Sequence, residues 1–354
     1  MFLGVSTLTE RGRSYRTMDD RIELRFLQNA MRAVRLVDPE LRIVVFTDDE
    51  THDAFPGFER VLVQGRRLGV LGGRGHMVAH AARKLGVDTV LAPMSCPLPP
   101  HHSFVQILLI TDLLFLGGVN GRDNAKVDRL PRNVRRALKA SGGVMCTSYA
   151  LQKSCSTRLS LGLERIYVAS PGVSDTFQSD IAPVAEPPYA LFPMNRYTQP
   201  CVSALREALQ KRPELFPPTV VVVGPSAPNE PEDWGCGAIR IERCPDTVLA
   251  SLLRHAELLI YPAVEDGCGM AVMEALRAGT PVLTARTGAP AEWGGSVPAY
   301  CEPENSTSII QALRRFQDET SSEQEDRLTM GRGSAGEATW ERCAWKVLAA
   351  LKHT

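Results

Sequence analysis

The segment EDGCGMAVMEALRAGTPVLT, residues 265–284, contains a glycine turn, a short helical pattern and the start of a strand. Two acids, Glu265 and Asp266, precede the glycines, and a Gly-Thr-Pro sequence ends the helix at Pro281. Glycines allow a tight bend and a close approach of a ligand to the backbone. The first amides of a helix lack intrahelical partners and carry the positive end of its dipole. The segment therefore predicts an anion-binding turn at the start of a helix.

Two carboxylates flank this turn, since Asp266 comes before it and Glu274 comes eight positions later in the helix. Carboxylates accept paired hydrogen bonds from neighbouring hydroxyls, so the pattern suits a ligand that has a sugar ring on each side of a diphosphate. A nucleotide sugar has this layout. The alternative is structural, because an acid before a helix is often only a cap and a helical Glu usually faces water.

The rest of the chain alternates strand and helix patterns around this segment. The predicted strands are residues 2–6, 41–46, 89–92, 107–110, 143–146, 165–169, 219–223, 258–261 and 281–284. The predicted helices are residues 19–37, 76–85, 131–140, 149–159, 246–256, 270–278 and 306–316, the first with Asp19 as its cap. Such alternation predicts an α/β protein with parallel, doubly wound sheets. The proline-rich residues 181–192 indicate a hinge between two such domains, with a ligand cleft between them.

Composition excludes several other classes of protein. The chain has 354 residues, of which 44% are hydrophobic and 23% charged, and its formal net charge is zero. No overall field attracts nucleic acid or an anionic membrane, and no apolar run is long enough for a membrane span. The nine cysteines form no C-x-x-C pair. They indicate reduced thiols in a reducing compartment, so we expect a cytoplasmic protein with neither a disulfide framework nor a metal site.

From Asp266 to Val282 the sequence resembles the signature of the retaining glycosyltransferases of family 4, E-G-F-G-L-P-V-L-E-A-M-A-x-G-T-P-V. The two acids, the glycines and the GTPV end all fall in register. The likeness extends through PDTVLASLLRHAELLIYPAVEDG upstream and TGAPAEWGGSVPAYCEPENSTSIIQAL downstream, to a closing helix at TWERCAWKVL. The resemblance implies a GT-B fold, with two Rossmann-like domains facing across a cleft.

The resemblance also implies roles for individual residues. Asp266 would bind hydroxyls of the donor sugar, and Glu274 would bind the ribose of the nucleotide. Backbone amides of the turn would meet the sugar and the diphosphate, and a segment after an earlier strand would lie near the base. The turn comprises Gly267, Cys268, Gly269 and Met270, and the segment near the base comprises Glu242, Arg243 and Cys244.

The chain departs from the family pattern at three positions. The family has a His in a segment like T-I-H-D-L, where LLITDLLFL places Thr111. It has Arg and Lys in a segment like G-R-L-x-P-x-K-G, where this chain has Gln199 and Pro200, with Arg196 the nearest cation. The first signature acid is an Asp, one methylene shorter than Glu, and Glu265 stands beside it. Loss of one charged contact to a leaving group costs about 10²–10³ in rate.

The resemblance implies four parts of the chain. They are a first domain at 1–182, a linker at 183–188, a donor domain at 189–335 and a closing helix at 336–354. The implied activity is transfer of a hexosyl group from a nucleotide diphosphate sugar to an unknown acceptor, with retention and without a cofactor or metal. Asp266, Thr111 and Arg196 are the catalytic candidates. The alternative is a catalytically weak or inactive relative that acts as a binding or regulatory subunit.

Overall fold

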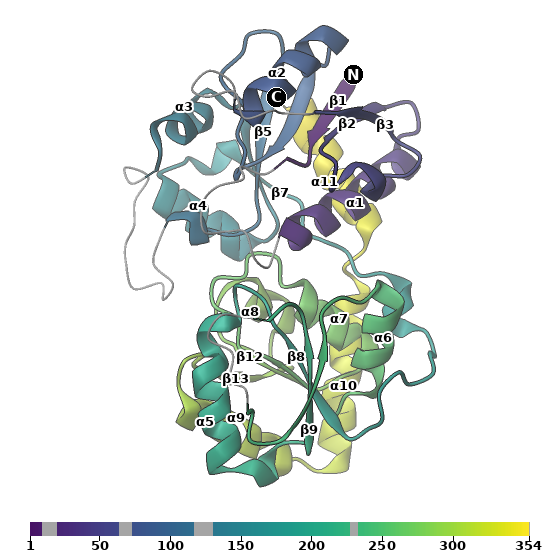
Figure 1. The fold of residues 1–354 in the computed structure, drawn as a ribbon, viewed down its shortest axis with the longest axis vertical. Coiled ribbons are helices and arrows are strands. Elements are labelled where there is room, and N and C mark those ends of the chain that lie inside the picture. The colour runs from purple at the N-terminus through teal and green to yellow at the C-terminus, as the bar shows by residue number, and fades with distance from the viewer. Residues whose placement is uncertain (9–19, 64–72, 117–129, 227–232, 354) are drawn as a thin grey trace. The chain divides into compact units, whose positions relative to one another are not determined.

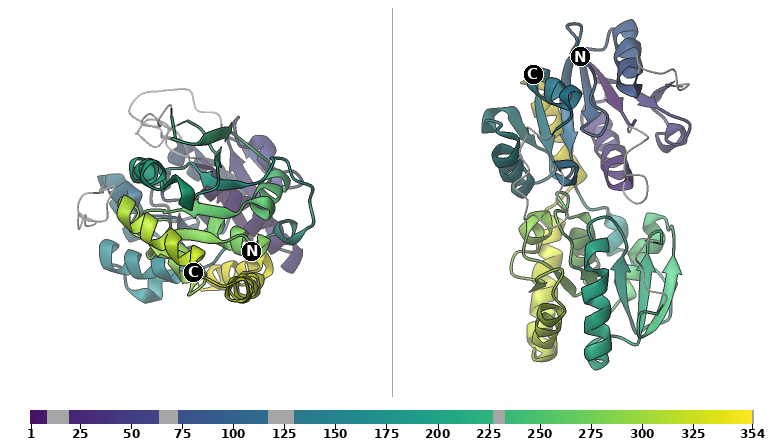
Figure 2. Two further views of the ribbon diagram at one scale, coloured as in Figure 1. Left: turned by 90° about the horizontal axis from the view of Figure 1, so that it is seen from below. Right: turned by 60° about the vertical axis from the view of Figure 1, so that its left-hand side comes forward.

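The structure is a computed structural model that describes residues 1–8, 20–63, 73–116, 130–226 and 233–353. The described chain divides into two compact units (Figure 1). The first unit comprises the described residues up to Pro171 and those from Trp340 onward. The second comprises the described residues from Gly172 to Thr339. Both ends of the chain therefore belong to the first unit (Figure 2).

Among the described residues, the first unit contains a parallel sheet of seven strands in the order β3-β2-β1-β4-β5-β6-β7. The strands are β1 (Phe2–Ser6), β2 (Arg42–Thr47), β3 (Glu59–Leu62), β4 (Thr89–Pro93), β5 (Val105–Ile110), β6 (Gly143–Cys146) and β7 (Ile166–Val168). The helices are α1 (Asp20–Val37), α2 (Arg74–Leu85), α3 (Arg132–Ala140), α4 (Tyr149–Leu159) and α11 (Trp340–Lys352).

Helices cover both faces of this sheet. Successive side chains of a strand point to opposite faces, so Ile43 and Val45 of β2 join the core under α1 and α11. Val44 and Phe46 join a second core with α2 instead. The helix α11 packs along α1, and the rings of Trp340 and Phe26 are 6.0 Å apart. The C-terminal segment thus completes the core of the unit that contains the N-terminus.

The second unit repeats the same winding, with a parallel sheet in the order β10-β9-β8-β11-β12-β13. Its strands are β8 (Tyr189–Pro193), β9 (Thr219–Val223), β10 (Gly237–Ile241), β11 (Leu258–Tyr261), β12 (Val282–Ala285) and β13 (Ala299–Cys301). Its helices are α5 (Val202–Lys211), α6 (Asp246–His255), α7 (Met270–Ala278), α8 (Gly288–Gly294), α9 (Ser306–Gln317) and α10 (Ser321–Gly336). Helix α5 packs on α9, whereas α7 packs on α6, α8 and α10.

The predicted α/β class with doubly wound parallel sheets is confirmed. The predicted hinge at 181–192 is wrong at its end, because Tyr189–Pro193 forms β8 at the centre of the second sheet. Ala190, Leu191 and Phe192 are fully buried there, although the prolines before them resemble a linker. The predicted domain boundaries stay predictions. The predicted helix cap at Asp19 lies outside the described residues.

Candidate functional site

The strand order of the second sheet reverses between β8 and β11, which pair side by side at its centre. Strand β9 follows on the far side of β8, and β12 on the far side of β11. In a parallel sheet of this kind, ligands bind beyond the carboxyl ends of the strands at the point of reversal. The loops that leave these strands are residues 194–198 and 262–269. The glycine turn therefore lies where this sheet topology favours a ligand.

Asp266 organises the turn. Its Oδ1 accepts hydrogen bonds from the amides of Cys268 and Gly269, at 2.8 and 3.1 Å. The hydroxyl of Tyr261, the last residue of β11, donates to its Oδ2 at 2.9 Å. The side chain is buried. Two of the four amides predicted to meet the donor thus already donate to Asp266, and a ligand oxygen would share them.

Glycine is required at position 269 for two reasons. Its φ is +67°, in the left-handed region that other residues avoid. A Cβ atom there would lie 2.6 Å from Cδ1 of Trp293, whose indole nitrogen donates to the carbonyl of Cys268 at 3.1 Å. The amide of Ala289 also donates to the carbonyl of Asp266 at 3.0 Å. The turn is therefore fixed between β11 and the start of α8.

A hydrogen-bonded chain links the two loops at the point of reversal. The Nδ2 of Asn195, just after β8, donates to the Tyr261 hydroxyl at 3.5 Å, and that hydroxyl donates on to Asp266. The Oδ1 of Asn195 accepts from the amides of Tyr197 and Thr198, at 3.0 and 3.1 Å. Sequence reasoning missed Asn195 and Tyr261. Their one signal was position, because each stands at the end of a central strand.

Glu274 lies in α7, one turn beyond Met270 on the same side of the helix. Only 5% of the residue is exposed. The alternative reading of a helical Glu that faces water is therefore wrong for this residue. Burial of a carboxylate is costly unless it is paired or hydrogen-bonded, so the buried Glu274 requires partners in the protein or in a ligand.

Glu265 and Arg196 stand on the two loops that flank this reversal. Glu265 adopts φ +59°, which is rare for a residue with a side chain and is frequent at functional sites. The guanidinium of Arg196 donates to the Tyr197 hydroxyl at 3.0 Å. Gln199 and Pro200 begin the short turn that leads into α5. Arg196 therefore belongs to the loop itself, whereas Gln199 belongs to the helix start.

The predicted base-binding segment follows β10. Glu242 and Arg243 are exposed, and Cys244 is half-buried. The carboxyl ends of β8, β9 and β10 are in register, because Pro193 pairs with Val223, which pairs with Ile241. Three strand spacings, roughly 14 Å, separate β10 from β11 along this edge. This distance is similar to the length of a nucleoside diphosphate.

Thr111 belongs to the first unit, where it directly follows β5. Its side chain is buried, and the neighbouring Asp112 accepts a hydrogen bond from the amide of Leu114 at 2.9 Å. The position is again the carboxyl edge of a parallel sheet, where ligands bind.

Two features that would indicate other chemistry are absent from the described parts of the chain. Within those ranges, no group of three or more His, Cys, Asp or Glu residues is arranged to hold a metal ion. Nor does any helix in them have the length and apolarity needed to cross a membrane. The nine cysteines are free thiols, and Cys268 in the glycine turn is fully buried.

Comparison with known proteins gives a family match and a set of shared folds. Residues 198–319 match the family model described as "Glycosyl transferases group 1". No curated protein matches the chain.

Several solved structures share the fold of the chain. Sucrose-phosphate synthase from Thermosynechococcus elongatus has a TM-score of 0.73 at 13% identity, over 99% of this chain and 98% of that one. HepE from Anabaena, solved with UDP-glucose, has a TM-score of 0.72 at 13% identity, over all of both chains. WaaG, a glycosyltransferase of lipopolysaccharide biosynthesis, has a TM-score of 0.67 at 17% identity, over 99% of each chain.

The family match contains α7 and its glycine turn, so it covers the signature segment of the predicted resemblance but not the closing helix at TWERCAWKVL. At these identities the solved structures support the fold alone. Together they confirm the predicted resemblance: residues 198–319 match the group 1 glycosyltransferase family model, and the two parallel α/β sheets have the GT-B-like fold.

Proposed function

We propose that this protein transfers a sugar from a nucleotide diphosphate sugar to an acceptor hydroxyl, with retention at the anomeric carbon. One observation carries the proposal. Asp266 and Glu274, both buried, bracket a glycine turn and a helix start at the point where the sheet order reverses. That arrangement offers amide donors and a helix dipole to a diphosphate, and carboxylates to hydroxyls on either side.

The proposed division of work follows from these positions. The sugar and diphosphate lie against residues 267–270, whose backbone Asp266 holds in place. Glu274 accepts from the ribose hydroxyls, and the base lies toward Glu242, Arg243 and Cys244. The bond from C1 to the diphosphate oxygen breaks while a bond from C1 to the acceptor oxygen forms. The hydroxyl proton passes to the oxygen of the departing nucleoside diphosphate, which gains negative charge as the C1–O bond breaks.

Arg196 would offset the charge that develops on the departing diphosphate. It is the cation on the β8 loop, three residues before Gln199, where the family has basic residues. The predicted catalytic role of Thr111 and the predicted donor-binding role of Glu265 stay predictions. Positioning and leaving-group stabilisation supply the rate in this scheme.

A panel of UDP-, GDP-, ADP- and TDP-sugars tests donor binding by thermal shift and then by calorimetry. UDP-glucose is the first candidate, because HepE was solved with it. The donor that raises the melting temperature should bind at least about 100-fold more weakly to Glu274→Ala, the loss of about 2.7 kcal/mol expected when a charged hydrogen bond disappears. The matched control is Glu325→Ala, at an exposed position of α10 in the same unit. Equal affinities in Glu274→Ala and wild type would refute the role of Glu274.

A second candidate function is donor binding without turnover. It is favoured by the three protein donors that engage Asp266, since that carboxylate has less capacity for a sugar. Release of nucleoside diphosphate from the bound donor separates the two. An enzyme releases it faster than the Arg196→Ala variant does. A binding subunit holds the same donor with equal, background release in both proteins.

A further inference from the structure

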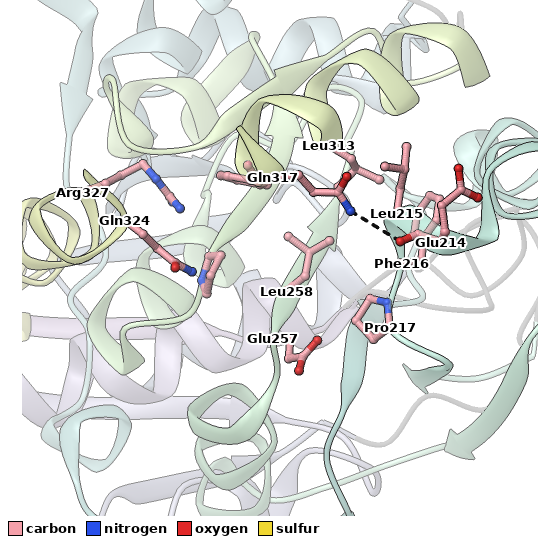
Figure 3. Close-up of a pocket in the computed structure, with 12 residues that line it drawn as sticks. Glu214, Leu215, Phe216, Pro217, Glu257, Leu258, Leu313, Gln317, Gln324 and Arg327 are labelled. Atoms are coloured by element: carbon pink, nitrogen blue, oxygen red, sulfur yellow. Dashed lines mark hydrogen bonds between the residues drawn. The ribbon is translucent and has the colours of Figure 1, made fainter. Parts of the chain in front are cut away.

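Figure 3 shows the residues that line a recess in the second unit. The recess lies at the end of the second sheet that is opposite the glycine turn. Leu258, which lines it, is the first residue of β11, whereas the turn leaves the last residue of that strand, Tyr261. Two other lining residues, Pro217 and Pro281, precede β9 and β12. The recess therefore opens at the amino edge of the sheet and is separate from the proposed donor site.

Its size and surface limit what it can hold. The volume is about 240 Å³, below the ~300–1,000 Å³ typical of pockets for drug-sized ligands. A nucleotide sugar is too large, but a single six-membered ring fits. Phe216, Leu258 and Leu313 are buried and give it an apolar floor, while Gln317 and Gln324 stand exposed at its rim.

One side of the recess carries a hydrogen-bond donor that the protein does not use. The Nε and Nη2 of Arg327 pair with Glu319, at 3.0 and 2.9 Å, and its guanidinium lies over the ring of Phe316 at 4.4 Å. The remaining nitrogen, Nη1, is buried and has no hydrogen-bond partner among the described residues. A buried donor without an acceptor destabilises the folded state. Arg327 lines the recess, so a small rotation of its guanidinium would let Nη1 donate to an acceptor oxygen of a ligand.

The other side carries acceptors. The carboxylates of Glu214 and Glu257 are exposed at the rim, that of Glu214 paired with Arg212. The Nε2 of Gln317 donates to the carbonyl of Glu214 at 3.4 Å (Figure 3). These carboxylates accept hydrogen bonds from hydroxyls and repel an anion. A ligand of this recess therefore needs both donors and acceptors, no negative charge and one apolar face.

We propose that the recess binds a single neutral monosaccharide unit, as a second carbohydrate site on the donor-side unit. The C–H face of a pyranose ring would cover Leu258 and Leu313. One ring oxygen or hydroxyl would accept from Arg327, and other hydroxyls would donate to Glu257. This site does not depend on the proposed transfer reaction.

Saturation-transfer NMR with methyl glucoside, methyl mannoside and N-acetylglucosamine tests the proposal. At least one neutral sugar should give a signal from its ring C–H groups. Gln317→Trp, which places an indole at the rim, should weaken that binding at least about 10-fold. Gln311→Trp is the matched control, because Gln311 is also an exposed glutamine of α9 but does not line the recess. Glucose 6-phosphate should bind more weakly than the neutral sugars.

Three results would overturn the proposal: no signal from any neutral sugar, equal signals in the two tryptophan variants, or tighter binding of the phosphorylated sugar. Calorimetry with the donor found in the nucleotide-sugar panel distinguishes this site from the donor site. Gln317→Trp should bind that donor as wild type does. Failure of every nucleotide sugar to bind would refute the proposed function and leave the monosaccharide result standing.

Discussion

Two buried aspartates, one in each unit, build the same turn. The Oδ1 of Asp48, just after β2, accepts from the amides two and three residues further along, at 3.2 and 3.0 Å. The Oδ1 of Asp266 accepts from the amides at the same two offsets, at 2.8 and 3.1 Å. Both residues lie at the carboxyl edge of a parallel sheet, and less than a tenth of each is exposed.

The second oxygen distinguishes the two. The Oδ2 of Asp48 accepts a hydrogen bond from the guanidinium of Arg74 at 2.9 Å, so this carboxylate has a cation beside it. In Asp266 it accepts from the hydroxyl of Tyr261, which links it to Asn195 across the centre of the sheet. The same local geometry thus places Asp48 in an ion pair with Arg74 in the first unit. In the second unit it shapes the loop that we propose meets the donor.

The largest difference should appear in donor affinity when each aspartate is replaced by Ala. Both changes leave two amides and at least one further donor without their acceptor, so each should destabilise the fold by about 2–4 kcal/mol. Asp266→Ala should also weaken nucleotide-sugar binding about 100-fold, whereas Asp48→Ala should leave it within about twofold. Calorimetry at a temperature where both variants are folded, checked by circular dichroism, measures this. A similar loss of affinity in both variants would contradict the functional distinction.

A smaller difference should separate two left-handed glycines. Gly269 has φ +67° and would place a Cβ 2.6 Å from Trp293, whereas Gly86, with φ +70°, has open space around its missing Cβ. Gly86→Ala should lower the free energy of unfolding only by the backbone strain, about 1–2 kcal/mol. Gly269→Ala adds the steric clash and should cost roughly 1–3 kcal/mol more.

Urea denaturation of the two alanine variants measures these costs. Equal destabilisation would show that both Trp293 and the backbone of Ala289 can move aside, and that the turn is less rigid than its hydrogen bonds indicate.

Sequence reasoning predicted most strands of the sheet interiors but missed the central β8, which follows a proline-rich stretch, and it missed the edge strands β3, β10 and β13. Thr219–Val223 reads as a strand because every residue is β-branched, and it is one. Gly237–Ile241 and Glu59–Leu62 lie at sheet edges, where exposed Arg, Glu and Ala replace the apolar pattern. Helix α10 was missed for a related reason, because it buries little besides Gly331 and Ala335. Its capping box, Thr320 with Glu323, was the available signal.

The site was predictable in its residue types but not in its contacts. The spacing of Asp266 and Glu274 on either side of a glycine turn could be read from one segment. The roles of Asn195 and Tyr261 could not be read in this way. They depend on β8 and β11 being neighbours in the sheet, although β9 and β10 lie between them in the sequence. The recess near Arg327 could not be predicted from the sequence either, because its lining comes from five separate segments.

The smallest expected effect is a pH dependence that belongs to Asp48. Burial raises its pKa, but the hydrogen bonds from Thr51 and the charge of Arg74 outweigh burial and hold the pKa below its ordinary value. A carboxyl whose folded pKa is depressed contributes stability above its unfolded pKa, and this contribution is lost as the pH falls through the folded value. Between pH 6 and pH 3, Asp48→Asn should therefore lose less stability than wild type. Asp49→Asn, at the exposed neighbouring position, should follow wild type in urea titrations at both pH values, and a parallel loss in all three proteins would exclude Asp48 as the titrating group.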